Sequence, residues 1–236
     1  MNGKKPSAMY SQTCAMCQAF GSNDKSEYTW NEQFANIVSH AVPAIISILL
    51  TLHTYNQAAP QESTYVLIYG VGITICFICS SIYHVAGIMK SEWVPFFLMF
   101  DYSAIFVNIA ASFTPWTKMA LAEHVVGTLV FYVVWLMAAF GIYNVFFKHF
   151  PKTKPETLYP VMVSFSLLLI YPLYLSDINY QAIAWMAVGL FWFIVGFVCF
   201  VKEKKISYGH ALFHTLVAVG NFTHWYGIYN HVIYDN

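Results

Sequence analysis

The chain has 236 residues, of which 58% are hydrophobic and only 9% are charged, and its mean hydropathy is +0.56. A soluble domain carries about 25% charged residues, so this composition excludes an ordinary water-soluble protein and indicates a chain surrounded largely by lipid. The formal net charge is zero, which argues against nucleic acid as a partner.

The apolar residues are gathered in seven stretches, separated by short segments that hold most of the charge. A helix that crosses a bilayer needs about 20 mostly apolar residues. We therefore predict an all-α fold, a single bundle of seven transmembrane helices within residues 29–236, because strand alternation is absent and lipid admits only helices or closed barrels. The predicted spans are Ala35–His53, Tyr65–Ala86, Pro95–Thr114, Val125–Phe147, Leu158–Leu175, Ala182–Val201 and Ser207–Tyr229.

Residues 1–28 precede the first predicted span and are polar. Lys4 and Lys5 are followed by no apolar run, which argues against a cleaved signal peptide. We predict a disordered cytoplasmic tail. Its Cys14 and Cys17 form a lone CxxC, for which palmitoylation or chance is favoured over a metal or redox role because no second CxxC accompanies it.

The basic residues give an orientation. All eleven are lysines, and with the N-terminus in the cytoplasm every one of them except Lys118 falls on the cytoplasmic side. Short cytoplasmic loops carry the excess of basic residues in membrane proteins. The pattern therefore predicts a cytoplasmic N-terminus and, with an odd number of spans, a C-terminus on the opposite side.

An ionisable side chain inside a span costs about 2.5–3.5 kcal/mol on insertion scales, and four of those in the predicted spans lie at a similar depth. They are His84 near the end of the second span, Asp101 in the third, and His210 and His214 in the last. At about 1.5 Å per residue, all four lie within about 10 Å of the cytoplasmic side. Three helices thus place polar groups in one layer of the membrane.

The spacing of these groups is typical of a metal site. His210 and His214 are four residues apart and share one helical face, and His84 offers a third nitrogen. Three histidines and a water form a catalytic zinc pattern. Ser80 lies one turn from His84 on the same face, and Asp101 is placed to orient the water or accept its proton.

Other interpretations of the same residues stay open. A pair such as His210 and His214 also arises as buried polar packing, and Asp101 as a hydrogen-bond partner between helices. Haem is disfavoured, because the two histidines share one face, and a proton path is disfavoured, because the groups cluster on one side. His40 is a candidate to support the zinc from outside, whereas His224 lies about 15 Å deeper than His214 and is predicted to bond a neighbouring helix.

At these residues the sequence resembles the progestin and adipoQ receptor family, also called the hemolysin III-related family. The short segment IAASFTPW is most like the monocyte-to-macrophage differentiation factor branch of that family. The matching motifs run in order along the chain: Glu32, Asn36 and His40; Ser80-x-x-x-His84; Asp101-Tyr102-Ser103; Ser112-Phe113-Thr114-Pro115-Trp116; and His210-x-x-x-His214.

The resemblance implies zinc bound by His84, His210 and His214, with Asp101 and Ser80 holding the water as catalytic residues. It implies a receptor-like or regulatory membrane protein, related to membrane lipid hydrolases such as alkaline ceramidases. Its substrates or partners would be membrane lipids, with ceramide or another sphingolipid cleaved at the amide. The alternative is a receptor or scaffold with purely structural zinc. The branch implies the Golgi or another internal membrane.

Overall fold

The computed structural model describes residues 28–147, 157–176 and 180–234. Most of the predicted tail, with Cys14 and Cys17, lies outside these ranges. Within them the protein is all-helical and contains no strand. Continuous apolar runs form helices because a helix satisfies its backbone hydrogen bonds within one segment, which lipid requires.

The helices follow the predicted stretches closely, and the bounds of α5 agree with the prediction. The predicted span Leu158–Leu175 is confirmed, and within it the helix is divided in two, because the backbone N–H of Phe165 and of Ser166 bonds to the carbonyl three residues back. The helices are α2 (Trp30–Gln57), α3 (Ser63–Ile88), α4 (Val94–Pro115), α5 (Val125–Phe147), α6 (Leu158–Ser164), α7 (Leu167–Leu175), α8 (Tyr180–Val201) and α9 (Gly209–Ile228).

Six segments of the described chain are long and apolar enough to cross a membrane. They correspond to α2, α3, α4 with its π-helical extension η1 (Trp116–Ala120), α5, α6 with α7, and α8. The last predicted span contains α9, a helix of 20 residues that is not among the six. It carries His210, His214 and His224, polar residues of the kind that are costly in lipid.

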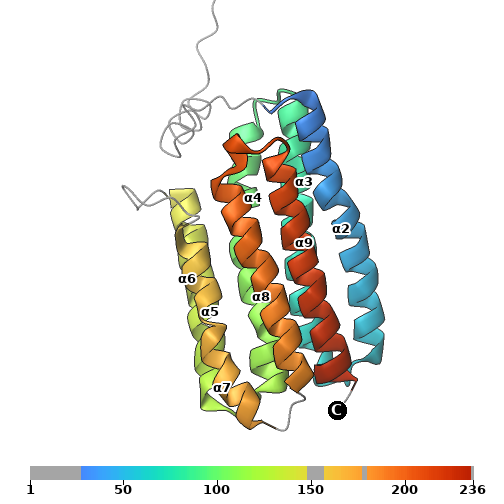
Figure 1. Ribbon diagram of the computed structural model, residues 1–236, viewed down its shortest axis with the longest axis vertical. Helices are drawn as coiled ribbons and strands as arrows, with labels where there is room; N and C mark the ends of the chain where they lie inside the picture. The colour runs from blue at the N-terminus through green and yellow to red at the C-terminus, as the bar shows by residue number, and fades with distance from the viewer. Residues whose placement is uncertain (1–27, 148–156, 177–179, 235–236) are drawn as a thin grey trace, which may run out of the picture.

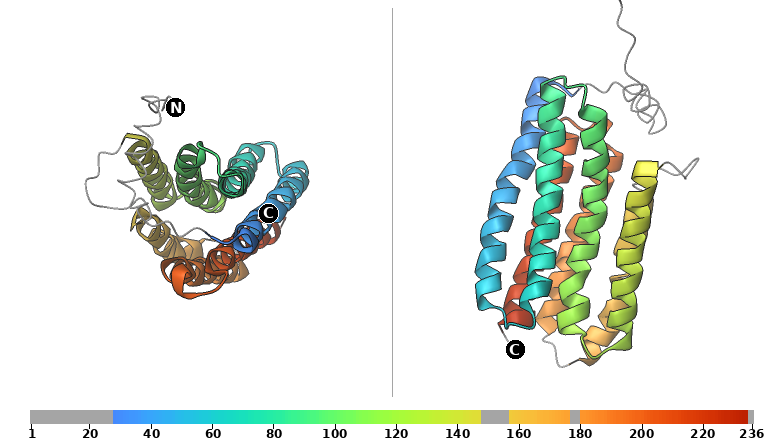
Figure 2. Two further views of the ribbon diagram at one scale, coloured as in Figure 1. Left: turned by 90° about the horizontal axis from the view of Figure 1, so that it is seen from above. Right: turned by 180° about the vertical axis from the view of Figure 1, so that it is seen from behind.

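The helices form one bundle in which neighbours in sequence are mostly neighbours in space (Figure 1). Seen from above, α9 lies between α8 and α2, so the last helix closes the bundle against the first (Figure 2). One end carries the start of α2, the α3–α4 connection with Lys90, and the α8–α9 connection with Lys202, Lys204 and Lys205. We call it the lysine-rich end. Lys118 belongs to η1, at the opposite end.

Large apolar side chains cover the outside of the bundle. Ile45 and Leu49 on α2 are each 62% exposed, and Leu136 on α5 is 68% exposed. A soluble monomer rarely shows apolar patches of the extent that such faces make. Inside, Phe77 and Phe106 are fully buried. This distribution indicates that the outer faces contact lipid and that the polar residues lie in the interior.

Two local structures at the lysine-rich end position the site. The first is a capping box at the start of α2, in which the Thr29 hydroxyl accepts from the backbone N–H of Glu32 and the Glu32 carboxylate accepts from that of Thr29. The second is the short helix η3 (Glu203–Lys205), which packs against the start of α9. A Cβ atom on Gly209 would lie 2.7 Å from the Glu203 carbonyl oxygen, so this close approach requires glycine.

Candidate metal centre

Three histidines meet at the lysine-rich end. His84 lies in the last turns of α3, and His210 and His214 occupy the first two turns of α9. One ring nitrogen from each forms a group whose members all lie within 4.8 Å of one another. In a tetrahedral zinc site, with Zn–N bonds of about 2.0–2.1 Å, two nitrogens are about 3.4 Å apart. Small side-chain rotations therefore bring the group to zinc-binding geometry.

Each of these histidines uses its Nδ1 atom in a contact with a neighbouring element. His84 Nδ1 lies 2.7 Å from Gln33 Oε1, and His210 Nδ1 lies 2.5 Å from Glu203 Oε2. His214 Nδ1 lies 3.2 Å from Ser39 Oγ and 3.3 Å from the backbone oxygen of Asn36.

These contacts assign the tautomer of each ring. The amide oxygen, the carboxylate and the backbone oxygen are acceptors, so each Nδ1 carries the proton and each Nε2 keeps its lone pair. The Nε2 atoms of His84 and His210 are buried and have no hydrogen-bond partner among the described residues. Histidines that bind metals usually donate their other ring N–H to such an acceptor. The residues present therefore fit a zinc ion.

The two predicted catalytic residues are close to this group. Ser80 is buried on α3, one turn from His84. Asp101 on α4 is close enough to interact electrostatically with His210, and it is also near Ser80. Ser80 Oγ nevertheless has no hydrogen-bond partner among the described residues. The structure thus brings together, at one end of the bundle, all five residues that the sequence analysis selected.

His40 on α2 contacts the centre directly. Its ring is stacked on that of His214, with centroids 3.7 Å apart and planes inclined by 18°, and its other neighbour is Phe77. The ring is 4% exposed. His40 therefore fixes the plane of the His214 ring from the α2 side. His224, by contrast, bonds the backbone oxygen of Met186 on α8 at 3.0 Å, which confirms its predicted contact with a neighbouring helix.

Tyr28 covers the centre from the lysine-rich end. Its ring centroid lies 5.3 Å from that of His210 and 6.1 Å from that of His84. Burial raises the pKa of Tyr28, and the negative charge of Glu203 raises it further. The phenol therefore stays protonated beside the Glu203 carboxylate.

Four residues around the histidines were not predicted from the sequence: Tyr28, Gln33, Ser39 and Glu203. Glu203 stands among three lysines, and nothing in that charged run distinguishes it from an ordinary loop residue. Gln33 directly follows Glu32 of the first motif, and the helical spacing from Gln33 to Asn36 and His40 was a usable signal, because these positions share one face of α2.

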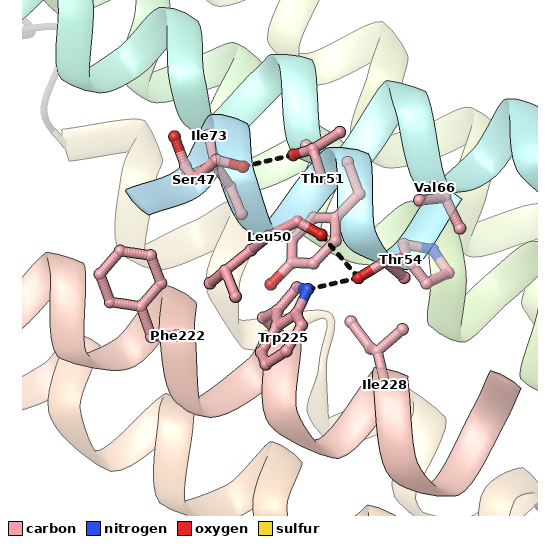
Figure 3. Close-up of a pocket in the computed structure, with 12 residues that line it drawn as sticks. Ser47, Leu50, Thr51, Thr54, Val66, Ile73, Phe222, Trp225 and Ile228 are labelled. Atoms are coloured by element: carbon pink, nitrogen blue, oxygen red, sulfur yellow. Dashed lines mark hydrogen bonds between the residues drawn. The ribbon is translucent and has the colours of Figure 1, made fainter. Parts of the chain in front are cut away.

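A small cavity between α2, α3 and α9 lies farther from the lysine-rich end (Figure 3). Trp225 Nε1 donates to Thr54 Oγ1 at 2.8 Å, and the Thr54 hydroxyl donates to the Leu50 carbonyl (Figure 3). The cavity has a volume of about 20 Å³, enough for about one water molecule, and no histidine or carboxylate lines it. It is therefore separate from the metal centre.

The sequence matches the family described as Haemolysin-III related over residues 28–225, which takes in every residue of the centre. The chain belongs to this family. It is 30% identical to the monocyte to macrophage differentiation factor of Homo sapiens over 89% of this chain and 88% of that protein. It is 28% identical to hemolysin-3 of Bacillus cereus, over 80% of this chain and 87% of that protein.

A more distant relative is the adiponectin receptor protein of Drosophila melanogaster, 22% identical over 89% of this chain and 53% of that protein. The family match and the six apolar helices together make the chain a multi-pass membrane protein of the haemolysin-III related family, with receptor-like relatives. The resemblance stated from the motifs is thereby confirmed at the level of the family.

Proposed function

We propose that the protein is a receptor-like or regulatory membrane protein that holds zinc between α3 and α9 and hydrolyses a lipid amide. One observation carries the zinc assignment: the ring nitrogens of His84, His210 and His214 converge, and each Nδ1 is engaged by an oxygen of another element. Catalytic zinc sites combine three protein ligands with an open position and ligands oriented from outside.

The proposed topology has seven spans, with the N-terminus and the lysine-rich end in the cytoplasm. Two observations support it: α9 lies within the bundle beside α8 and α2, and the described lysines other than Lys118 lie at one end. Positive charge favours the cytoplasmic side. Single cysteines placed at Ser91 and at Met119, in a variant that lacks the native cysteines, test the orientation in sealed microsomes. The cytoplasmic face of these vesicles is outside, so an impermeant reagent should label Ser91→Cys and leave Met119→Cys protected.

The chemistry proposed for the centre is hydrolysis, in which water adds to the amide carbonyl carbon and the C–N bond breaks. When bound, zinc activates the water and polarises the carbonyl oxygen. Asp101 accepts a proton from the attacking water and returns it to the departing amine. Ser80 positions the water or the carbonyl oxygen, and His40 holds the His214 ring in place.

The substrate class proposed is an uncharged membrane lipid with an amide, such as ceramide or another sphingolipid. The location of the centre supports this choice, because about 10 Å of depth is where a lipid presents the bonds that join its head group to its chains. We propose the Golgi or another internal membrane as its location, and the resemblance to the monocyte-to-macrophage differentiation factor branch supports this choice. Imaging of the tagged protein beside organelle markers tests that location.

The metal content of the purified protein tests the proposal first. Mass spectrometry of the detergent-solubilised wild type should find about one zinc per chain. The double variant His210→Ala/His214→Ala should lose it, whereas His53→Ala should keep it, because His53 contacts Tyr229 at the opposite end. If the wild type is folded but contains no metal, the zinc assignment is wrong.

A second experiment tests hydrolysis. Asp101→Asn should keep its zinc, because the Asp101 carboxylate is not one of the three proposed ligands. Its turnover of a ceramide in detergent micelles should be about 10²–10⁴-fold lower than that of the wild type. Unchanged turnover would remove Asp101 from the mechanism. Absence of turnover in the zinc-loaded wild type favours the second candidate, a structural zinc that joins α3 to α9, two helices far apart in the sequence.

A further inference from the structure

The metal centre is closed on its outer side by two residues that come from different parts of the chain. Tyr28 precedes α2, and its ring lies over His210 and His84. Glu203 belongs to η3, in the connection between α8 and α9. Neither residue belongs to the two helices that supply the histidines. A change in the Tyr28 side chain therefore leaves the helices that carry the histidines in place, whereas Glu203 is tied to the start of α9.

Glu203 joins this cover to a metal ligand. Its carboxylate accepts a hydrogen bond from His210 Nδ1 at 2.5 Å, and it lines the same pocket as Tyr28. Glu203 therefore contacts a proposed metal ligand from the side of the pocket that it shares with Tyr28. A carboxylate bound to a histidine in this way fixes the orientation of the ring and raises its basicity as a metal ligand.

His210 is also the histidine of the three that is nearest to water. Its side chain is 12% exposed and that of Glu203 is 18% exposed, whereas His84 and His214 are 0% and 2% exposed. On the α2 side, the buried ring of His40 covers His214, and the buried ring of Phe77 packs against His40. The side of His210 is thus the most open of those that the structure describes.

A pocket lies directly outside this cover. Its volume is about 340 Å³, which is large enough to admit a hydrated ion, and it opens at the lysine-rich end. Tyr28 and Glu203 line both the pocket and the metal centre. The remaining lining residues are Glu32, Lys204, Lys205, Ile206 and Ser207.

We infer that Tyr28 and Glu203 form the passage by which a zinc ion moves between this pocket and the three histidines. Tyr28 is the cover, whose ring must turn aside to let the ion pass. Glu203 is a positioning residue for His210 and the anionic group that connects the pocket to that histidine. The inference rests on the proposed function, in that the histidines hold zinc.

The exchange rate of zinc in the full-length, zinc-loaded protein in detergent tests this passage. Release is followed as colour formation with an excess of 4-(2-pyridylazo)resorcinol, and uptake by the metal-free protein is followed separately. A cover changes only the barrier, so Tyr28→Ala should speed release and uptake alike, by about tenfold, and leave the dissociation constant unchanged. Tyr28→Phe keeps the ring and should stay within about twofold of the wild type.

Glu203→Gln should behave differently. The amide oxygen still accepts from His210 but the negative charge is gone, so the affinity for zinc should fall by about 10–100-fold through faster release. Ser207→Trp adds a bulky ring at the mouth of the pocket and should slow both rates. This variant keeps the test valid if Tyr28→Ala does not fold.

Tyr55→Ala is the matched control, because Tyr55 is an exposed tyrosine near the other end of α2. Its rates should equal those of the wild type. Unchanged release and uptake in both Tyr28→Ala and Ser207→Trp, with zinc bound, would overturn the passage and leave the zinc site intact. A folded wild type that binds no zinc would overturn the proposed function, and the passage with it.

Discussion

The three histidines of the centre are held by three different kinds of acceptor: the Gln33 amide, the Glu203 carboxylate and the backbone oxygen of Asn36. Each fixes a tautomer that leaves Nε2 for the metal. Only the Glu203 carboxylate is charged, and Asn36 contributes its backbone rather than its side chain. Gln33 is therefore the anchor whose removal changes orientation without changing the charge of the site.

The substitution Gln33→Leu tests this role of Gln33. The substitution removes the acceptor of His84 Nδ1 while keeping an apolar body of similar size, so zinc affinity should fall by about 10–100-fold with the protein still folded. Competition with a chelator of known affinity measures it. Gln57→Leu, at an exposed position near the other end of α2, is the control. Equal affinity in both variants would mean that Gln33 does not orient His84.

The three histidines could be predicted from the sequence, but not all of the residues that orient them could. The pairing of His210 with His214 follows from helical periodicity, and the depth of His84 follows from the order of the spans. The partnership of Glu203 with His210 depends on how the α8–α9 connection folds back. Hydropathy and spacing do not encode that fold, so Glu203 was indistinguishable from its charged neighbours.

At the scale of the elements, the connection between η3 and α9 decides where His210 points. Tyr208 has φ = 56°, a left-handed backbone conformation, and Gly209 follows it at the first position of α9. The missing Cβ at Gly209 lets η3 lie against the helix start, where a Cβ would be 2.8 Å from Glu203 Cα. The neighbour here is backbone, which cannot move aside as a side chain can.

Gly209→Ala should therefore displace η3, at a cost of about 1–3 kcal/mol in the free energy of unfolding, typical of overpacking. The melting temperature should fall, and zinc affinity should fall with it because Glu203 leaves His210. Tryptophan fluorescence during heating and chelator competition measure the two effects. Gly196→Ala on α8 is the milder control, since its Cβ would meet Leu216 Cβ at 3.3 Å. An unaltered melting temperature and affinity would show that η3 tolerates the methyl group.

The helices themselves were largely predictable, because long apolar runs leave the backbone no alternative in lipid. The bounds of α5 agree, and α2 extends beyond its predicted start because Thr29 and Glu32 form a capping box that hydropathy does not register. The break between α6 and α7 was not predictable, since Phe165 and Ser166 lie in an apolar run with no glycine or proline beside them.

At the scale of the whole molecule, the centre links the beginning, middle and end of the chain. His84 belongs to α3, the other two histidines belong to α9, and α2 supplies the supports from Gln33 to His40. A bound ion would therefore join α3 to α9, two helices that are separated along the chain by most of the bundle. Ligand binding stabilises a folded state by about 2.7 kcal/mol at a free concentration 100 times the dissociation constant.

This linkage predicts a zinc-dependent melting temperature. Chelation should lower the melting temperature of the wild type in detergent and should leave that of His84→Ala unchanged, because that variant has lost the ligand from α3. Because each protein is measured with and without chelator, any lowering of the melting temperature by the substitution itself cancels in the comparison. His53→Ala should respond as the wild type does. A wild type that loses its zinc with no change in melting temperature would contradict this linkage, because an ion held only by the folded protein stabilises it whether its role is catalytic or structural.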